Sequence, residues 1–417
     1  MLENLPNRDI ICIDMKSFYA SCIALLEGLD VMQVPIAVIA NFEQPGSVVL
    51  AASPPMTERF RIKTGNRRFE IPDHPDIRLF EPKMSFFLEM SIAITKLIET
   101  FVPRDAIHVY SIDECFVDLT GTEKLWGPTI DTAKAIQQAI YRQFHIYSAV
   151  GMGPNMLMAK LALDLEAKKI GFAKWTYEDV PTKLWPVRPL SKMWGIGSRM
   201  EKNLNNMGIF SVGCLANSDL GVLEKRFGIM GNQLYYHAWG IDYSRLGEPI
   251  LQGQISFGKG QMLMRDYKST EDIFIVILEM CEDVARRTRT AGYAGRTVSL
   301  GLSYNHSAMT RGFYRSKTMD EPTNETLALY RVCKELFFTH FKGEAVRQIS
   351  IRLTNIEKAS SVQLDLFDEG KEKRQRLAYT MDHLRTKYGS SAVLRAVSYT
   401  PAGTALHRQR LVGGHLA

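Results

Sequence analysis

The sequence predicts an α/β protein of several domains, because its character changes twice along the chain. Residues 1–170 alternate strand-like apolar runs with amphipathic helical segments, which is typical of a sheet covered by helices. Residues 181–240 consist of short helical pieces interrupted by glycines, with no convincing strand. Residues 255–356 follow the order strand, helix, strand, strand, helix, strand, which indicates a separate split βαβ domain.

Hydrophobic period places the individual elements. In the first domain, strands are expected at residues 9–14, 108–120 (a pair) and 147–150, and helices at 84–100, 130–144 and 155–169. In the split βαβ domain, helices are expected at 271–290 and 324–338. The chain from residue 357 onward begins polar and contains the charge run GKEKRQR, so we expect a tail with at least one short helix.

Composition and charge are those of an ordinary globular protein with a weak preference for polyanions. The 417 residues are 46% hydrophobic and 23% charged, enough to bury several cores. Lys and Arg number 51 against 45 Asp and Glu, a formal charge of +6. Residues 253–356 hold 15 Lys and Arg against 11 Asp and Glu, so this quarter supplies most of the excess and is a candidate phosphate-facing surface.

The six cysteines and the apolar runs bear on location. The cysteines are far apart and lack metal-ligand spacing, as expected of reduced thiols in the cytoplasm. No window approaches the ~20 apolar residues of a membrane span. We therefore expect a soluble cytoplasmic protein without a membrane segment.

Three acids occupy positions that could form one catalytic centre. Asp14 ends an apolar strand, and Asp113 and Glu114 are adjacent within the expected strand pair. Three converging carboxylates would repel one another without cations, and hard oxygen ligands suit Mg²⁺. Adjacent strand residues point to opposite faces, so Asp113 and Glu114 can share a site only at a turn or bulge. From spacing alone, the acids could equally be polar strand ends.

Three motifs in order carry a resemblance to a known family. IDMKSFYASC at residues 13–22, SIDECFVDLT at 111–120 and VGMGPNMLMAKLA at 150–162 resemble the Y-family DNA polymerases, and the likeness runs from residue 10 to about 356. The resemblance implies two Mg²⁺ ions, with Asp14, Asp113, Glu114 and the Met15 carbonyl as ligands. It also implies a palm (1–22 and 79–175), fingers (23–78), a thumb (176–246), a little finger (253–356) and a C-terminal tail (357–417).

The same resemblance assigns the nucleotide pocket. Tyr19 is expected to pack under the sugar, where a ribose 2′-hydroxyl would clash, and Phe18 to line the pocket. The alternative is that both are ordinary core aromatics. Lys160, and less firmly Lys168, would neutralise the triphosphate as charge develops in the transition state.

The chain also departs from the family pattern. Many relatives carry a second acid where this chain has Lys16, whose side chain cannot be a ligand. Pro55 and Glu58 stand where a Tyr and an Arg usually contact the triphosphate. Arg59 or Arg61 is therefore the expected substitute.

KMWGIGSRMEKNLNNMGI at residues 192–209 reads as helix, tight turn, helix, similar to a helix-hairpin-helix. Gly195 and Gly197 would let backbone N–H groups approach a DNA phosphate, with Arg199 and Lys202 following. A plain loop is the alternative. The Trp of WGIG resembles the polymerase V catalytic subunit (UmuC-type) branch of Gram-positive bacteria or their phages more than polymerase IV.

In the little finger, RGFYRSK spaces Arg311, Phe313, Arg315 and Lys317 at period two, which predicts one strand face able to follow a DNA backbone. A solvated edge strand with protective charges is the alternative.

The tail contains QLDLF, which resembles the bacterial sliding-clamp binding pentapeptide. The expected clamp contacts are Gln363, Leu364, Leu366 and Phe367. An incidental helix start is the alternative.

Together these features predict template-directed, error-prone translesion DNA synthesis on primer-template DNA with deoxynucleoside triphosphates, and the sliding clamp as partner. No segment is left over for a proofreading exonuclease. The main alternative is a non-catalytic scaffold that binds DNA and the clamp. A nucleotidyl cyclase and a deoxycytidyl-only transferase are further alternatives.

Overall fold

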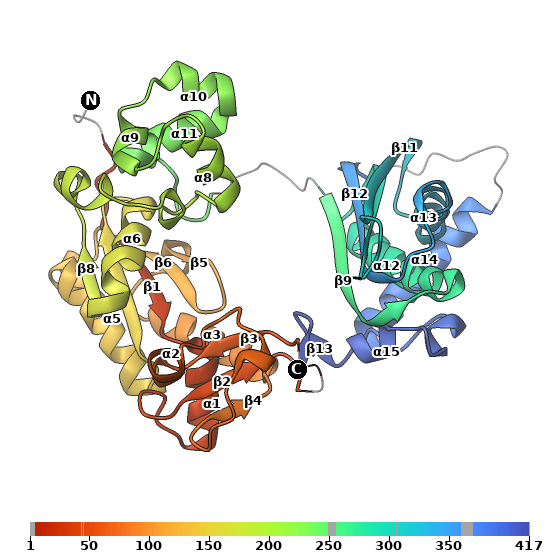
Figure 1. Cartoon of the computed structure of the whole chain (residues 1–417), viewed down its shortest axis with the longest axis horizontal. Coiled ribbons are helices and arrows are strands. Elements are labelled where there is room, and N and C mark those ends of the chain that lie inside the picture. The colour runs from red at the N-terminus through yellow and green to blue at the C-terminus, as the bar shows by residue number, and fades with distance from the viewer. Residues whose placement is uncertain are drawn as a thin grey trace. The chain divides into compact units, whose positions relative to one another are not determined.

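The computed structural model describes residues 5–42, 44, 46–248, 256–305, 307–359 and 370–416. The chain divides into two compact units, one of residues 1–249 with 415–417 and one of residues 250–414 (Figure 1). Among the helices described, none is both long and apolar enough to cross a membrane.

A five-stranded sheet forms the centre of the first unit. Its order is β5-β6-β1-β7-β8, with β1 antiparallel to both neighbours and β7 parallel to β8. The central strand IICIDM is rich in β-branched isoleucine, and all its residues except Asp14 are buried, as expected for a strand with a partner on each side. The strands are β1 (Ile10–Met15), β5 (Ile107–Val109), β6 (Glu114–Asp118), β7 (Ser148–Gly153) and β8 (Phe172–Lys174).

Helices flank this sheet at the expected places. The helix α5 packs against β7, and α3 packs against both α1 and α5. The helices are α1 (Phe18–Glu27), α3 (Met84–Ile98), α4 (Glu123–Trp126) and α5 (Thr129–Phe144), with a short 3₁₀ turn η2 (Arg104–Ala106).

The segment expected as one helix after β7 contains a π turn. It consists of α6 (Met156–Ala162), the π turn η3 (Leu163–Ala167) and α7 (Lys168–Ile170). The backbone of this segment packs directly on β7: a Cβ added at Gly151 would come within 2.3 Å of the Ala159 oxygen of α6 and 2.2 Å of the Leu163 nitrogen of η3. The lack of a side chain at Gly151 in β7 therefore permits a close helix–strand contact.

Residues 36–80 form a smaller sheet of their own. Its strand order is β3-β2-β4, and its core includes Val49, Met56 and Ile62. The Ser53 side chain caps the following helix by accepting a hydrogen bond from the Met56 N–H. The elements are β2 (Ile36–Ile39), β3 (Val49–Ala52), α2 (Pro54–Phe60), η1 (Arg68–Glu70) and β4 (Arg78–Phe80).

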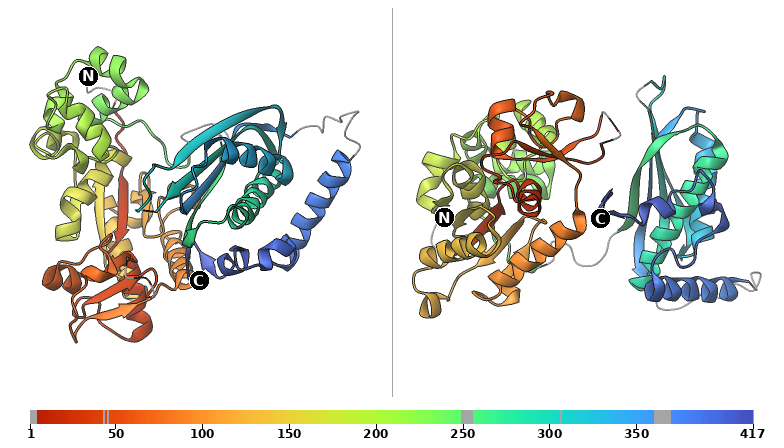
Figure 2. Two further views of the ribbon diagram at one scale, coloured as in Figure 1. Left: turned by 45° about the vertical axis from the view of Figure 1, so that its right-hand side comes forward. Right: turned by 90° about the horizontal axis from the view of Figure 1, so that it is seen from below.

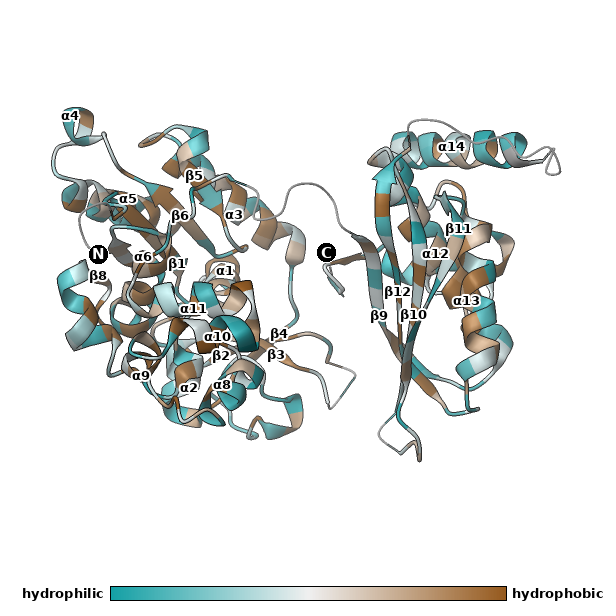
Figure 3. Cartoon of the chain, turned by 90° about the horizontal axis from the view of Figure 1, so that it is seen from above, coloured by the Kyte–Doolittle hydropathy of each residue, from teal (hydrophilic) through white to brown (hydrophobic). Residues whose placement is uncertain are grey.

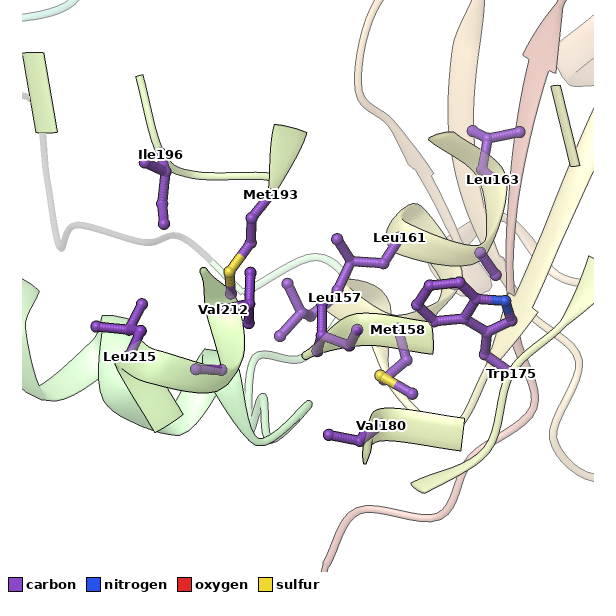
Figure 4. Packing of buried hydrophobic residues seen from close by; sticks show 14 of the residues in the cluster. Leu157, Met158, Leu161, Leu163, Trp175, Val180, Met193, Ile196, Val212 and Leu215 are labelled. Carbon is purple, nitrogen blue, oxygen red and sulfur yellow. The ribbon is translucent and has the colours of Figure 1, made fainter. Parts of the chain in front are cut away.

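The segment from 177 to 238 contains short helices joined by turns and no strand, in agreement with the prediction for residues 181–240. Its buried side chains continue the core of α6, and Figure 4 shows Leu157 and Met158 of α6 near Val212 and Leu215 of the later helices. The elements are η4 (Tyr177–Asp179), η5 (Val180–Leu184), η6 (Leu190–Lys192), α8 (Ser198–Asn205), α9 (Val212–Ala216), α10 (Leu220–Phe227) and α11 (Ile229–Ala238).

The second unit has the predicted strand and helix order. Its antiparallel sheet runs β11-β10-β12-β9, and α12 and α13 lie on one face (Figures 2 and 3). Val298, Leu300 and Leu302 point to that covered face and are buried. The elements are β9 (Ser256–Tyr267), α12 (Thr270–Thr290), β10 (Tyr293–Tyr304), β11 (Phe313–Thr323), α13 (Thr326–His340) and β12 (Val346–Lys358).

The described part of the tail is more ordered than the sequence predicts. Its charge run begins an 18-residue helix that crosses one end of the helix layer (Figure 3). The guanidinium of Arg289 at the end of α12 binds Asp382 of this helix, with Nε 2.7 Å from Oδ2. The elements are α14 (Lys371–Tyr388), η7 (Ala396–Tyr399), α15 (Ala405–Arg408), β13 (Leu411–Val412) and β14 (His415–Leu416).

Candidate active site

The three acids lie at the end of the β1/β6 pair. Asp14 is directly opposite Glu114 in the antiparallel register, so both side chains emerge on the same face. Asp113 precedes the strand and lies in a bend, where its carbonyl accepts a 2.9 Å hydrogen bond from the Met15 N–H. The bend meets the geometric condition for adjacent Asp113 and Glu114 to serve one site. Met15 ends β1, and its carbonyl stays a predicted ligand.

Two ammonium groups reach these acids. Lys160 Nζ is 2.6 Å from Glu114 Oε1, and Lys168 Nζ is 3.1 Å from Asp14 Oδ2. Asp164 accepts from both lysines, at 3.2 and 3.0 Å. Asp164 was not among the residues expected at the site, although it lies four residues from each lysine on one helical segment, a spacing that places the three side chains on the same side.

The π turn explains why both lysines face the site. Eight residues of regular α-helix leave two side chains about 80° apart around the axis. A π turn takes in one extra residue, which reduces this offset to about 20°. Because η3 lies between Lys160 and Lys168, the two ammonium groups lie on the same side of the segment.

Burial and like charge act together on Asp14. Burial raises the pKa of Asp14 to about 6, Lys168 opposes the rise, and the charges of Asp113 and Glu114 add to it. A buried thiol lies behind the cluster, since Cys12 Sγ donates to Glu114 Oε1 at 3.0 Å. Burial and the Glu114 charge raise the pKa of Cys12 well above its usual value, so it remains a neutral donor.

The donor set fits a hard divalent cation shared with a substrate. Within the described residues, no group of three or more His, Cys, Asp or Glu side chains forms a ready-made metal site. Mg²⁺ does not require one, because it takes few protein carboxylates and completes its octahedron with water and phosphate oxygens. In the described part of the chain, four carboxylates, those of Asp14, Asp113, Glu114 and Asp164, lie here with only the two ammonium groups of Lys160 and Lys168, and a cation would relieve this excess of negative charge.

The two aromatics expected at the nucleotide pocket begin α1. Ser17 adopts a left-handed conformation (φ 49°) and turns the chain from β1 into this helix. Phe18 is buried, whereas Tyr19 is half-buried and stacks on Phe87 of α3, with ring centroids 4.5 Å apart and an interplanar angle of 13°. The sequence analysis included Phe87 only as one apolar residue of an expected helix. Lys16 is exposed.

The two candidate arginines around α2 differ in their contacts. Arg59 pairs with Asp76, with Nη2 2.7 Å from Oδ2. Arg61 ends the helix with a left-handed backbone (φ 60°), and its exposed side chain makes no ion pair within the described residues. Glu58 is exposed and Pro55 is buried. The unengaged side chain favours Arg61 over Arg59 as the triphosphate contact, which stays a prediction.

The helix-hairpin-helix candidate is shorter than expected on its first side. A single 3₁₀ turn, η6, precedes the glycines where the sequence suggests a helix. Residue 195 has a φ of +93°, a conformation that glycine adopts readily and other residues rarely do. Gly197 is the N-cap of α8, and a Cβ added there would meet nothing within 4 Å. Arg199 and Lys202 are exposed on α8. Their contact with DNA stays a prediction.

The strand-face prediction for the little finger needs correction. Arg311 precedes β11 and is not part of the strand. Arg315 and Lys317 do share a face, but they lie opposite Leu300 and Val298, on the side that the helices cover. Lys317 accordingly forms an ion pair with Glu335 of α13 (51% and 55% exposed side chains), rather than facing outward from the open side of the sheet.

The opposite face, here called the open face, carries small and polar residues. Ser299 and Ser316 share a hydrogen bond across β10 and β11, as do Thr297 and Thr318. Arg352 of β12 pairs in register with Ser299, so it lies on this face and is exposed. The sequence analysis did not single out Arg352. The predicted clamp contacts at residues 363–367 lie outside the described residues.

Comparison with known proteins identifies the family. The impB/mucB/samB family matches residues 13–164, its C-terminal domain matches 254–366, and the IMS family HHH motif matches 177–209. The chain is 55% identical to a putative UV-damage repair protein, UvrX, of Bacillus subtilis (strain 168) and 38% identical to DNA polymerase IV 2 of the same organism, with 99% of each chain covered in both cases. These Gram-positive relatives agree with the predicted branch.

The fold matches independently. A Y-family DNA polymerase chimera, Dbh-Dpo4(243-245)-Dbh, superposes with a TM-score of 0.66 over 84% of this chain and 99% of that chain, at 19% identity. At this identity the likeness speaks for the fold alone. Together with the matches along the sequence, it means that the chain belongs to the impB/mucB/samB family, the Y family of DNA polymerases.

Proposed function

We propose that the chain extends a primer across damaged template DNA by two-metal-ion nucleotidyl transfer. The observation that carries this proposal is the placement of Asp14, Glu114 and Asp113 at one strand end, with two lysines of the next helical segment turned toward them. The names of the relatives, a UV-damage repair protein and DNA polymerase IV, support the same activity.

Two Mg²⁺ ions held by Asp14, Asp113, Glu114 and the Met15 carbonyl would lower the barrier to in-line attack of the primer 3′-hydroxyl on the α-phosphate. Lys160 and Lys168 each lie within 3.2 Å of a cluster carboxylate. From there, their ammonium groups could form ion pairs with a triphosphate bound beside the cluster. Cys12 and Lys160 both hold Glu114 Oε1, which leaves Oε2 as the oxygen available to an ion.

The half-buried Tyr19 supports selection of deoxynucleotides, because its ring edge would meet a 2′-hydroxyl of the incoming sugar. Its phenol lies close enough to Asp113 for that charge, after burial, to raise the Tyr19 pKa. Tyr19 is therefore near the position that the primer end and the nucleotide would share.

DNA contact is proposed at two places. The exposed N-terminus of α8 with Gly195, Gly197, Arg199 and Lys202 offers unobstructed N–H groups to one phosphate. In the little finger, a backbone contact is proposed either through Arg352 on the open face or through Arg311, Arg315 and Lys317 on and beside the edge strand β11. The pentapeptide at 363–367 is proposed to bind the sliding clamp.

Primer extension tests the proposal. The purified chain is given a primer-template with each of the four deoxynucleotides in turn, on undamaged DNA and opposite an abasic site, with Mg²⁺ omitted in one series. Templated insertion that requires Mg²⁺, and that Asp113→Ala abolishes, supports the proposal. Insertion of deoxycytidine alone would indicate the narrower transferase, and unchanged DNA binding without any extension would indicate the scaffold.

A further inference from the structure

A cavity of about 220 Å³ lies in the second unit, between α12 and the C-terminal tail. Sites that enclose drug-sized molecules are larger, ~300–1,000 Å³, so this one has room for a small ion and its water rather than for a whole nucleotide. The exposed residues Ser390 and Gln409 line it, so it is open to solvent. More than half of its lining belongs to the tail, beyond residue 366, where the match to the family's C-terminal domain ends.

Bases outnumber acids around this cavity. In the described part of the chain, three acids of α12 are ion-paired with six bases of β9, α12 and the tail, which leaves an excess of three positive charges. A further acid, Asp382, lies 3.9 Å from Arg385, but Arg289 already binds both of its oxygens. The three acids are Glu279, Glu282 and Asp283, and the six bases are Lys259, Arg286, Arg287, Arg385, Arg395 and Arg408.

The bases act on one another and leave a donor without a partner. Burial lowers the pKa of Lys259, and the charges of Arg408 and Arg287 lower it further, whereas Asp283 opposes the change. Arg408 lines the cavity, and its buried Nε–H has no hydrogen-bond partner among the described residues. Such donors are uncommon in folded proteins, because they lose their hydrogen bonds to water. An anion in the cavity would accept this bond and reduce the repulsion between the bases.

We propose that the cavity binds one oxyanion of the size of a phosphoryl group, through Lys259, Arg286, Arg408 and the Ser391 hydroxyl. Guanidinium groups present fixed pairs of N–H donors that match two phosphate oxygens, which a chloride ion cannot use. The bound anion holds the tail against α12, because both contribute its contacts. Its source is either free phosphate or a phosphate of the DNA backbone, which share this chemistry. The carboxylate cluster belongs to the first unit, so the inference does not depend on the proposed function.

The first test titrates inorganic phosphate into the full chain by isothermal titration calorimetry, without Mg²⁺ and at a constant ionic strength set with chloride. We expect saturable binding that Arg286→Gln weakens roughly tenfold or more, because the variant loses one charged hydrogen bond. Asp283 keeps Lys259 and Arg287 as partners in this variant, so we expect it to fold.

Arg347→Gln is the matched control. The Arg347 side chain is 33% exposed, like that of Arg286, and it pairs with Asp266 of the same unit at 3.7 Å. The control removes the same charge away from the cavity and should keep the wild-type affinity for phosphate. Ser391→Ala removes a lining hydroxyl and no ion pair, so it serves if Arg286→Gln fails to fold. It should weaken binding roughly twofold to tenfold.

Hydrogen exchange measured by mass spectrometry locates the bound anion. Phosphate should slow amide exchange in α12 and in the tail around Arg408, and chloride at the same ionic strength should not. The physical reason is that a ligand of the folded state raises the free energy of local opening at its site. The protection should therefore grow with phosphate concentration and be weaker in Arg286→Gln.

A short DNA duplex without terminal phosphates identifies the source of the anion. If Arg286→Gln weakens binding of the duplex more than Arg347→Gln does, the anion is a phosphate of the DNA backbone. If it weakens binding of inorganic phosphate alone, the site takes a free phosphate. The inference is overturned if Arg286→Gln and Ser391→Ala bind both ligands as tightly as Arg347→Gln does, or if neither ligand protects the tail more than chloride does.

Discussion

Two groups of charged, largely buried side chains in this chain differ in their ratio of acidic to basic groups. In the first unit, the carboxylate cluster of Asp14, Asp113 and Glu114 gathers acids against one another. In the second unit, Glu279, Glu282 and Asp283 of α12 are each paired with basic side chains. Glu279 accepts from Thr404 Oγ1 at 2.7 Å, from the Thr404 and Ala405 N–H groups, and from Arg408.

One aspartate of each group shows how burial and neighbouring charges combine. Burial raises the pKa of Asp14 to about 6; Lys168 lowers it, but not enough to cancel burial, and Asp113 and Glu114 add smaller increases. Burial also acts to raise the pKa of Asp283 on α12, but Lys259, Arg287 and Arg286 outweigh it and lower the value. Two buried aspartates of one chain therefore shift in opposite directions. Carboxylates with too few basic partners can bind added cations, whereas carboxylates fully paired with Lys and Arg serve to hold structural elements together.

The largest effect is expected when the carboxylate cluster loses one member. Asp113→Ala should reduce single-turnover primer extension on the order of 10⁴-fold, because members of a catalytic group act as a unit. Since the cluster is short of positive charge, the same change should leave the thermal midpoint unchanged or raise it. Asp105→Ala, an exposed aspartate of the same unit, is the matched control. Full-rate extension by Asp113→Ala would contradict the assignment.

A loss of stability, rather than of activity, is expected at the ion pair between α12 and the tail helix α14. Arg289 binds both oxygens of Asp382, and their side chains are 2% and 11% exposed. Arg289→Ala should destabilise the second unit by about 3 kcal/mol, since it removes the bidentate partner of the buried Asp382 carboxylate and leaves it only a 3.9 Å contact with Arg385. Denaturant unfolding measures this loss. Replacing both partners, Arg289→Met with Asp382→Leu, should restore most of the stability, and equal losses in the single and double variants would contradict a charge-matched joint.

A smaller effect separates the arginines at α2. Arg61→Ala should raise the nucleotide KM roughly tenfold or more, as expected for one charged hydrogen bond to phosphate, with little change in kcat. Arg59→Ala should affect KM less, because Arg59 already pairs with Asp76. Steady-state kinetics at fixed Mg²⁺ distinguishes the two, and a larger effect of Arg59→Ala would reverse the assignment.

The smallest effect concerns the two faces of the little-finger sheet. Arg352→Ala should reduce the slope of log affinity against log salt by about 1, as for the loss of one phosphate contact. Lys317→Ala should change the slope less, since Glu335 already neutralises Lys317. DNA binding measured from low to moderate salt compares them. A greater loss for Lys317 would place the DNA contact on the strand edge beside α13.

Much of the architecture was readable from local pattern. The β-branched apolar run in DIICID and the helical period of residues 271–290 predicted β1 and α12 to within a residue or two, because both are local properties of the sequence. The helical character of residues 177–238 followed from glycine punctuation in the same way. The acids Asp14, Asp113 and Glu114 and the lysine Lys160 can be recognised from the sequence alone, since their motifs have a fixed order and spacing, and their roles stay predictions.

Tertiary structure decided what depends on register and on packing between distant segments. Period two puts Arg315 and Lys317 on one face, but only pairing with β10 determines that this is the helix-covered face. Phe87 comes to lie under Tyr19, and Asp382 beside Arg289, across gaps of many residues that no local pattern spans. The sequence alone thus determined which groups the chain has for chemistry, and the three-dimensional packing determined which side chains hold them in place, because contact between remote residues is a property of the whole fold.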